Sequence, residues 1–323
     1  MGQWHHSLNT DTLPATMQIA ERLYSLAKEQ ENAALMTGAC SALGITLFFL
    51  GDFEPAGCYL GQGLELWRSG GGPSSVEEVD VRAVSCLCYK ADCDWHLGEI
   101  ASSHATIVEA ICLANVLNNT HGLAEALAEA LASAASLGHS ECNPAEVERC
   151  TSELMELATR HHFAHWRAVG AIYGGWARSA SGDTAGGLAW IEDGLQRWRA
   201  TGAVRVTPVW LTIKAEALHF AGHTCEALEA IKNAEALIGR SHEREWFAEL
   251  HRLRGVFLAA VGADENQIEA SFCAAIGIAR EQKSVSLEKR AEATYAEYCR
   301  QKASGLGGRE FQLPLLTAPG PSK

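Results

Sequence analysis

The histidines near the middle of the chain come closest to a catalytic or metal-binding set. His161, His162 and His165 lie within five residues, and His161 and His165 are four apart. On a helix this spacing places two imidazoles on one face, as two zinc ligands require. A zinc hydrolase of the H-E-x-x-H kind also needs a glutamate beside the first histidine, whereas the run here is HHFAH. The three histidines therefore fit a solvated helix end better than a metal centre.

The eleven cysteines form an odd set without a C-x-x-C pair. Cys86, Cys88 and Cys93 with His96 could hold a metal, but a helix would point Cys86 and Cys88 to different sides. Most cysteines fall on apolar helix faces, where a thiol packs as a small hydrophobic residue. We expect free, largely buried thiols, which indicates a reducing cytoplasmic location.

The glycine-rich segment SGGGPSSVEEVD, residues 69–80, is the stretch most similar to a phosphate-binding loop. It is not closed by G-K-[S/T] and no strand leads into it, so it predicts a loop between helices. The sequence has no G-x-S-x-G nucleophile motif, and its carboxylate pairs fall on solvent-facing helical positions. We therefore predict no catalytic, cofactor-binding or metal-binding residues, and a protein that is not an enzyme.

Helix–turn–helix units recur along the chain and would have to position any binding residues. Gly182, Gly222 and Gly262 are spaced 40 residues apart, and each follows an apolar helical run, as helix-ending glycines do. Residues 207–282 contain the unit twice, with small residues where two helices must touch. A fixed period of this size indicates a repeat array. The predicted fold is all-α, a TPR-like α-solenoid in which antiparallel helix pairs form a right-handed superhelix.

The array should comprise about fourteen helices over residues 14–302. Residues 32–71 match the tetratricopeptide pattern most clearly, with Gly51 at the turn. In the unit that ends near residue 282, Phe272 should fill the space between repeats. We expect residues 1–13 to be an N-terminal extension and residues 303–323, rich in glycine and proline, to be a disordered tail.

Charge and hydropathy exclude several partner classes. The net charge is −13, from 26 basic and 39 acidic residues, and this disfavours direct contact with nucleic acid or an anionic membrane. Apolar runs such as ALGITLFFLG, residues 42–51, are shorter than the roughly 20 residues that span a bilayer. The N-terminal MGQWHHSLNTDTLP lacks the basic start and apolar centre of a secretory signal. We expect a soluble cytoplasmic protein.

The concave surface of a solenoid, formed by the first helix of each pair, is the natural place for a ligand. The repeat register places Trp176, Glu216, His219 and Arg252 on that surface, where an aromatic side chain and both signs of charge would converge. We predict that these four residues bind a protein or peptide partner or another ligand. The alternative is that they are solvated or packed against neighbours. Other positions on the same surface are Ser41, Ile45, Phe48, Ile172, Ser179, Thr212 and Val256.

Several stretches together resemble a known family region. They are ALGITLFFLGDFEPA, AVSCLCY, NPAEVER, GWARSASGD, GLQRWRATG, AELHRLRGVFLAA and EASFCAAIGIAREQKSVSLEKRAEATYAEYCRQK. The chain is similar to the C-terminal tetratricopeptide region of bacterial proteins that join a STAND-type ATPase to an adenylate/guanylate cyclase or to a winged-helix transcription-factor domain. The resemblance implies a role in such a regulatory system, with an ATPase or cyclase module encoded nearby. Because cyclase aspartates, Walker motifs and a winged helix are absent, it does not imply ATP hydrolysis or cyclic nucleotide synthesis.

Two functions remain open from the sequence. In the first, the chain is a non-catalytic scaffold or sensor that binds a protein, a peptide or a small inducer. In the second, it is a truncated C-terminal fragment of a cyclase or of an ATPase-type transcriptional regulator, without its catalytic and DNA-binding domains. An upstream reading frame that encodes a Walker A loop would favour the second.

Overall fold

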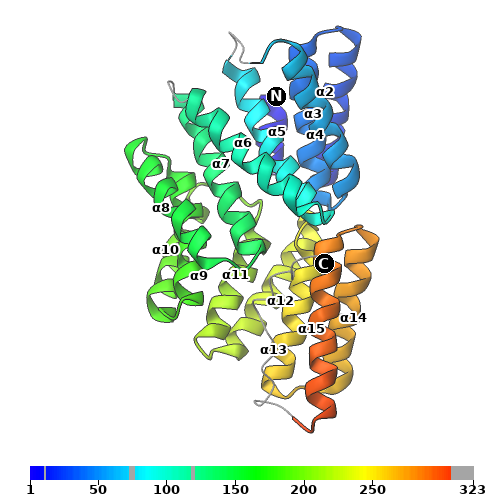
Figure 1. The fold of residues 1–323 in the computed structure, drawn as a ribbon, viewed down its shortest axis with the longest axis vertical. Helices are drawn as coiled ribbons and strands as arrows, with labels where there is room; N and C mark the ends of the chain where they lie inside the picture. The colour runs from blue at the N-terminus through cyan, green and yellow to red at the C-terminus, as the bar shows by residue number, and fades with distance from the viewer. Residues whose placement is uncertain (11, 73–76, 118–120, 307–323) are drawn as a thin grey trace.

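The computed structural model describes residues 1–323 except 11, 73–76, 118–120 and 307–323, and throughout this part the regular elements are α-helices (Figure 1). The helices are α1 (Gly2–Thr10), α2 (Leu13–Glu29), α3 (Ala33–Leu50), α4 (Phe53–Ser69), α5 (Glu77–His96), α6 (Ile100–Leu117), α7 (His121–Ser140), α8 (Pro144–Arg160), α9 (Ala164–Ala180), α10 (Thr184–Ala200), α11 (Thr207–Phe220), α12 (Thr224–Ser241), α13 (Phe247–Val261), α14 (Glu265–Glu281) and α15 (Val285–Ala303).

Helices that follow one another in the chain pack as antiparallel pairs, for example α3 with α4, α9 with α10 and α13 with α14. This confirms the predicted all-α, TPR-like solenoid. The described residues contain fifteen helices, whereas the sequence predicted about fourteen, because α1 forms within residues 1–13. Most of the predicted tail, residues 307–323, lies outside the described residues.

The 40-residue period is a period of helix ends. Gly182, Gly222 and Gly262 have φ values of 104°, 81° and 72°, which residues with a side chain rarely adopt. Asp183 then begins the next helix by accepting a hydrogen bond from the backbone N–H of Gly186. Each unit therefore reverses direction at a glycine and restarts within a few residues.

Small residues set the distance between paired helices. A Cβ atom on Gly175 of α9 would lie 2.6 Å from the carbonyl oxygen of Gly187 on α10, so only glycine allows this approach. On α13, a Cβ atom on Gly255 would lie 2.8 Å from the ring of Phe272. Phe272 is fully buried, as predicted from its register.

The two halves of the array contact each other, so the solenoid closes on itself (Figure 1). The segment between α12 and α13 reaches α3, where the backbone N–H of Arg244 donates to the Phe49 oxygen over 2.7 Å. At the start of α15, Ser284 Oγ lies 2.9 Å from Nδ1 of His96 on α5, and Ser286 donates to the Trp95 carbonyl. The C-terminal repeats therefore cover part of the inner face that an open solenoid would expose.

Two of the described helices, α3 and α6, are long and apolar enough to cross a membrane. Counting only runs of adjacent apolar residues missed them, because each has small and polar residues interspersed over 18 positions. In α3, 72% of the span is buried inside the structure, as expected for a core helix; in α6 the share is 22%. An apolar face of α6 that includes Val108 and Val116 is exposed.

Candidate functional site

A cavity of about 1040 Å³ lies among the helices of the first two thirds of the array, between residues 1 and 206. Its volume is at the upper end of the roughly 300–1,000 Å³ typical of ligand pockets. Side chains from α1, α3, α5, α7 and α9 and from the 201–206 segment between α10 and α11 line it. The cavity therefore joins elements that are up to 200 residues apart in the chain.

Helix α1 forms one wall of this cavity and is held by hydrogen bonds at both ends. The indole N–H of Trp4, which is 1% exposed, donates to Thr46 Oγ1 on α3 over 3.0 Å. Arg205 Nε donates to the Leu8 oxygen over 2.5 Å, and the N–H of Val204 donates to the Asn9 oxygen over 3.2 Å. These contacts tie α1 to α3 on one side and to the 201–206 segment on the other.

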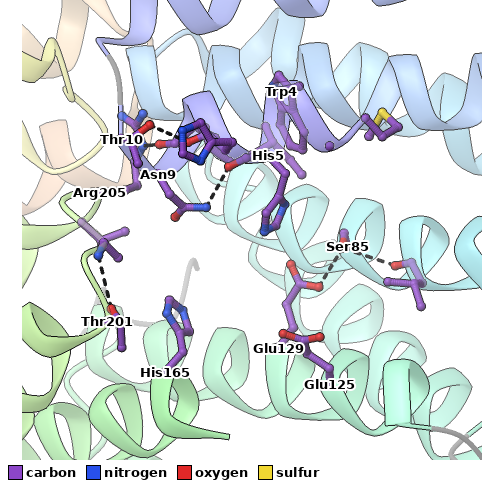
Figure 2. A pocket seen from close by; sticks show the side chains of 18 of the residues that line it. Trp4, His5, Asn9, Thr10, Ser85, Glu125, Glu129, His165, Thr201 and Arg205 are labelled. Carbon is purple, nitrogen blue, oxygen red and sulfur yellow. Dashed lines mark hydrogen bonds between the residues drawn. The ribbon is translucent and has the colours of Figure 1, made fainter.

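Polar side chains converge on the cavity from separate helices (Figure 2). His5 points in from α1, Glu125 and Glu129 from α7, and His165 from α9, while the Ser85 hydroxyl of α5 donates to Glu129 over 2.7 Å. Burial raises the pKa of the Glu129 carboxyl. It lowers the pKa of His5 and brings the pKa of His165 down to about 4. Both imidazoles are therefore mainly neutral at pH 7.

The charged groups of the cavity are unevenly paired, and Arg82 in its lining acts on the Glu129 carboxyl without an ion pair to it. Of its arginines, Arg82 pairs with Glu78 over 2.9 Å, and Arg205 lies 3.8 Å from Glu243. Within the described part of the chain, Glu125 and Glu129 form no ion pair with a lysine or arginine. The α7 side of the cavity thus has two carboxylates available to a bound group.

Three buried donor nitrogens, on two side chains of other walls, have no hydrogen-bond acceptor among the described residues. They are the terminal guanidinium nitrogens of Arg205, whose side chain is 3% exposed, and the indole N–H of Trp166. The remaining lining is largely apolar or aromatic and includes Phe49, Tyr89 and Trp198. Unmet donors thus stand apart from the carboxylates, across an apolar space.

The predicted site residues Trp176 and Glu216 lie on the inner face but are buried, at 0% and 4% exposure. Trp176 Nε1 donates to Glu216 Oε2 over 2.8 Å, and His139 Nε2 lies 3.1 Å from the other carboxylate oxygen. The partly exposed His219 places Nδ1 3.0 Å from Thr224 Oγ1. The structure thus brings Trp176 and Glu216 together and leaves His219 outside their hydrogen bonds.

Arg252, the fourth predicted residue, is 1% exposed and forms two hydrogen bonds with Glu249, of 2.9 and 2.6 Å. Arg290 of α15 lies 3.3 Å from the same carboxylate. Burial alone would raise the pKa of Glu249, but the two guanidinium groups outweigh it and lower the pKa to about 2. Three of the four predicted residues, Trp176, Glu216 and Arg252, are therefore buried against neighbouring side chains, and His219 is partly exposed. A binding role for the four residues stays a prediction.

The histidine and cysteine clusters found in the sequence separate in the fold. His161 stacks on Phe163, while His165 turns into the cavity. Cys86, Cys88 and Cys93 are buried free thiols, and His96 stacks on Phe53 with ring centres 3.7 Å apart. Across the described ranges, no group of three or more histidine, cysteine or acidic residues is arranged to hold a metal.

The sequence reasoning missed the residues that line the cavity from α1 and α7. The four-residue spacing of Glu125 and Glu129 was the available signal, since it places both carboxylates on one helix face. Trp4 and His5 belong to the stretch assigned to an extension, and only the fold shows that this stretch returns to the inner face.

No protein-family model matches the chain. It is 28% identical over 206 residues to the uncharacterized protein R02095 of Rhizobium meliloti (strain 1021). That match covers 63% of this chain and 19% of the relative, so the chain spans about a fifth of that protein's length. The crystal structure of the apo form of RapI aligns over 91% of this chain and 93% of that chain, with 13% identity and a TM-score of 0.37.

Proposed function

We propose that this chain is a non-catalytic, TPR-like binding module, a scaffold or sensor that takes up a ligand in the inner cavity. The observation that carries the proposal is the cavity of about 1040 Å³, into which side chains from α1, α5, α7 and α9 converge. Such convergence of a few polar groups in a largely apolar space is typical of ligand sites. We place the module in the cytoplasm, in a bacterial signalling or transcription-regulatory system, without direct contact to nucleic acid or membrane.

A binding role is favoured over catalysis by how the polar groups of the cavity are used. The Ser85 hydroxyl donates to Glu129 and, in the described structure, forms no hydrogen bond with an imidazole that could activate it. Partial loss of solvent around their rings lowers the pKa values of His5 and His165, which leaves them poor proton carriers near pH 7. These groups can accept hydrogen bonds from a ligand. A protein partner would then respond to the occupied state.

A cavity-blocking variant tests the proposal. Glu125 is exposed and points into the cavity, so Glu125→Trp should fill the space without disturbing the core. Ligands would be found by thermal-shift screening of metabolites and short peptides against the wild type. Glu125→Trp should need at least tenfold more ligand than the wild type to reach the same thermal stabilisation. Glu148→Trp, at an exposed position of α8, should respond to the ligand as the wild type does. Equal responses of both variants would place the binding site elsewhere.

The alternative is that the chain is a C-terminal fragment of an adenylate/guanylate cyclase or of an ATPase-type transcriptional regulator. It is favoured by the relative in Rhizobium meliloti, in which the similar segment makes up 19% of a longer protein. Reading the genomic sequence upstream of this chain tests it. A continuous or adjacent frame with a Walker A loop would support the fragment or a nearby ATPase partner, and an isolated gene would contradict both.

A further inference from the structure

We propose that the closure of the array depends on a bound proton, because it buries two carboxyl groups, Glu243 and Glu245, around the single guanidinium of Arg205. The closure is the packing of residues 243–246, between α12 and α13, against α3, α5 and the 201–206 segment. The array should be firmly closed at lower pH and should loosen as the pH rises. This dependence on pH belongs to the fold itself and requires no ligand, so it goes beyond the proposed function.

Residues 243–246 make the contacts that close the array. The backbone N–H of Arg244 donates to the Phe49 oxygen at the end of α3 over 2.7 Å. The ring of Trp246 lies 6.1 Å from that of Trp95 on α5. This short segment therefore touches two helices that precede it by about 150 to 200 residues, and its detachment would open the array.

The two glutamates of this segment both lie inside the closure. Glu243 is 2% exposed and Glu245 is 5% exposed. Arg244, between them, is partly exposed and pairs with the exposed Glu281 over 3.1 Å. The side chains thus alternate between the inside and the outside of the joint. The segment cannot dock on α3 without taking both carboxyl groups out of water.

Arg205 is the cation buried with these carboxyl groups. One of its terminal nitrogens lies 3.8 Å from Glu243, which also accepts a hydrogen bond from the backbone N–H of Val206 over 2.7 Å. Neither carboxylate oxygen of Glu245 accepts a hydrogen bond from another residue in the part of the chain that the structure describes. Two carboxylates around one guanidinium would leave one negative charge unbalanced, and burying such a charge is costly.

The other groups around this cluster do not supply the missing positive charge. The titratable side chains that act on it from the neighbouring helices are neutral or acidic: Tyr89 and Asp92 of α5 and Tyr173 of α9. Loss of solvent around Asp92 raises the pKa of its carboxyl to about 8. The imidazoles of His96 and His139 lie against the ring of Trp246. Over the described ranges, Arg205 alone among lysines and arginines forms an ion pair with Glu243 or Glu245.

A proton on one carboxyl group removes the unbalanced charge. Burial raises the pKa of both, and the charge of Glu243 raises the pKa of Glu245 further, well above its usual 4.5. In an open array the Glu245 carboxyl would meet water and titrate near its usual pKa. Between these two pKa values the closed array holds one proton more than the open one. The closing equilibrium therefore shifts toward the open array by up to about tenfold for each unit of rising pH.

The same cluster connects the closure to the cavity. Arg205 Nε donates to the Leu8 oxygen at the end of α1, and Arg205 and Phe49 belong to the cavity lining. The guanidinium also lies over the Phe49 ring, 5.3 Å from its centre. Detachment of Glu243 and Arg244 would release Arg205 and Phe49 on one side. Opening of the closure should therefore loosen this wall of the cavity.

Hydrogen exchange of the full chain, followed by mass spectrometry, tests this proposal. The amide of Arg244 reports the closure directly, because it is bonded to the Phe49 oxygen. Exchange would be measured at pH 5, 6, 7 and 8, and each rate would be divided into the intrinsic rate at that pH to give a protection factor. We expect the protection factor of residues 243–246 in the wild type to fall at least tenfold between pH 5 and pH 8.

Glutamine variants assign the effect to the cluster. Glu245→Gln keeps the shape of the side chain without its titration, so the protection factor should change by less than about threefold over the same range. Glu243→Gln should act in the same direction, because Arg205 could then balance Glu245 alone. Glu281→Gln is the matched control: this carboxylate lies on the exposed side of the same joint, and Arg244 lowers its pKa. It should keep the pH dependence of the wild type.

Three results would overturn the proposal. The first is a wild-type protection factor that stays constant from pH 5 to pH 8. The second is a pH dependence in Glu245→Gln equal to that of the wild type. The third is an equal loss of pH dependence in Glu281→Gln, which would assign the effect to surface charge. Thermal unfolding would check that each variant is folded, and if Glu245→Gln is not, Glu243→Gln decides by the same criterion.

Discussion

The indole N–H of Trp176 on α9 donates to a carboxylate oxygen of Glu216 on α11, 40 residues later and 2.8 Å away, with both side chains buried. The separation equals one repeat period, so the bond joins equivalent inner positions of successive units. His139 of α7 approaches the other oxygen of Glu216 at 3.1 Å. Trp176 and Glu216, which were expected to meet a partner, therefore hold three repeats together with His139.

Removing the indole donor should destabilise the fold. In Trp176→Phe the Glu216 oxygen stays buried without its donor, and leaving a buried polar group unmet costs about 1–3 kcal/mol. We expect this loss in the free energy of unfolding, measured in urea. Trp190→Phe is the control, because Trp190 is 40% exposed and should cost well under 1 kcal/mol. Equal, small effects in both variants would contradict the buried bond.

The Glu249 carboxylate should stabilise the protein most above about pH 5. Its pKa is about 2 in the fold against 4.5 for the free side chain, so its contribution is present above pH 4.5 and is lost as the pH falls toward 2. At pH 7, Glu249→Gln should cost about 3–5 kcal/mol, because Arg252 and Arg290 remain buried without the carboxylate. Urea unfolding at pH 7, 5 and 3 should show that the difference in unfolding free energy between Glu249→Gln and the wild type becomes smaller as the pH falls. A constant difference would rule out this linkage.

Truncating Phe272 should cost about 3–5 kcal/mol, since its ring is fully buried against Gly255. The neighbouring Cys273 is exposed on the same helix and supplies a matched control. We expect Phe272→Ala to lower the unfolding free energy by that amount and Cys273→Ala to change it by less than about 0.5 kcal/mol. An unchanged midpoint for Phe272→Ala would show that the ring does not fill the space between α13 and α14.

Two helical glycines should respond to alanine with opposite changes in stability. A Cβ on Gly187 of α10 would lie 2.8 Å from the Ser179 backbone nitrogen, so Gly187→Ala should cost about 1–3 kcal/mol through overpacking. Gly277 of α14 is exposed and has no atom within 4 Å of its Cβ position. Gly277→Ala should stabilise the helix by about 0.5–1 kcal/mol. Thermal unfolding of the two variants would test both signs, and a Gly187→Ala variant as stable as the wild type would contradict the close α9–α10 contact.

The fold was predictable because its signals are local. Helix-ending glycines such as Gly222 and Gly262, small residues such as Gly255 and large ones such as Phe272 act within one helix pair. Trp176, Glu216 and Arg252, which the register placed on the concave face, are all buried in the structure.

What the sequence did not reveal is what covers that face. The contacts of Ser284 with His96 and of Arg205 with Leu8 join residues 188 and 197 positions apart, and no period in the sequence marks them. A surface expected to be open therefore became core, while the cavity formed where α1 and the 201–206 segment meet. Distant pairing of this kind depends on the curvature of the whole array, which single repeats do not encode.

The closure between α3–α5 and the segments around Arg244 and Ser284 changes how the protein should lose its structure. An open repeat array is quasi-one-dimensional, and its end units can unravel one at a time. Here the final helices hold the early ones through Phe49, Trp95 and His96, so fraying from the C-terminal end would strip contacts from the first third of the chain. The two ends of the array therefore share one cooperative transition. Inserting a repeat in the middle of the array would separate surfaces that now meet. The closure therefore restricts the number of repeats, whereas an open solenoid can gain or lose them.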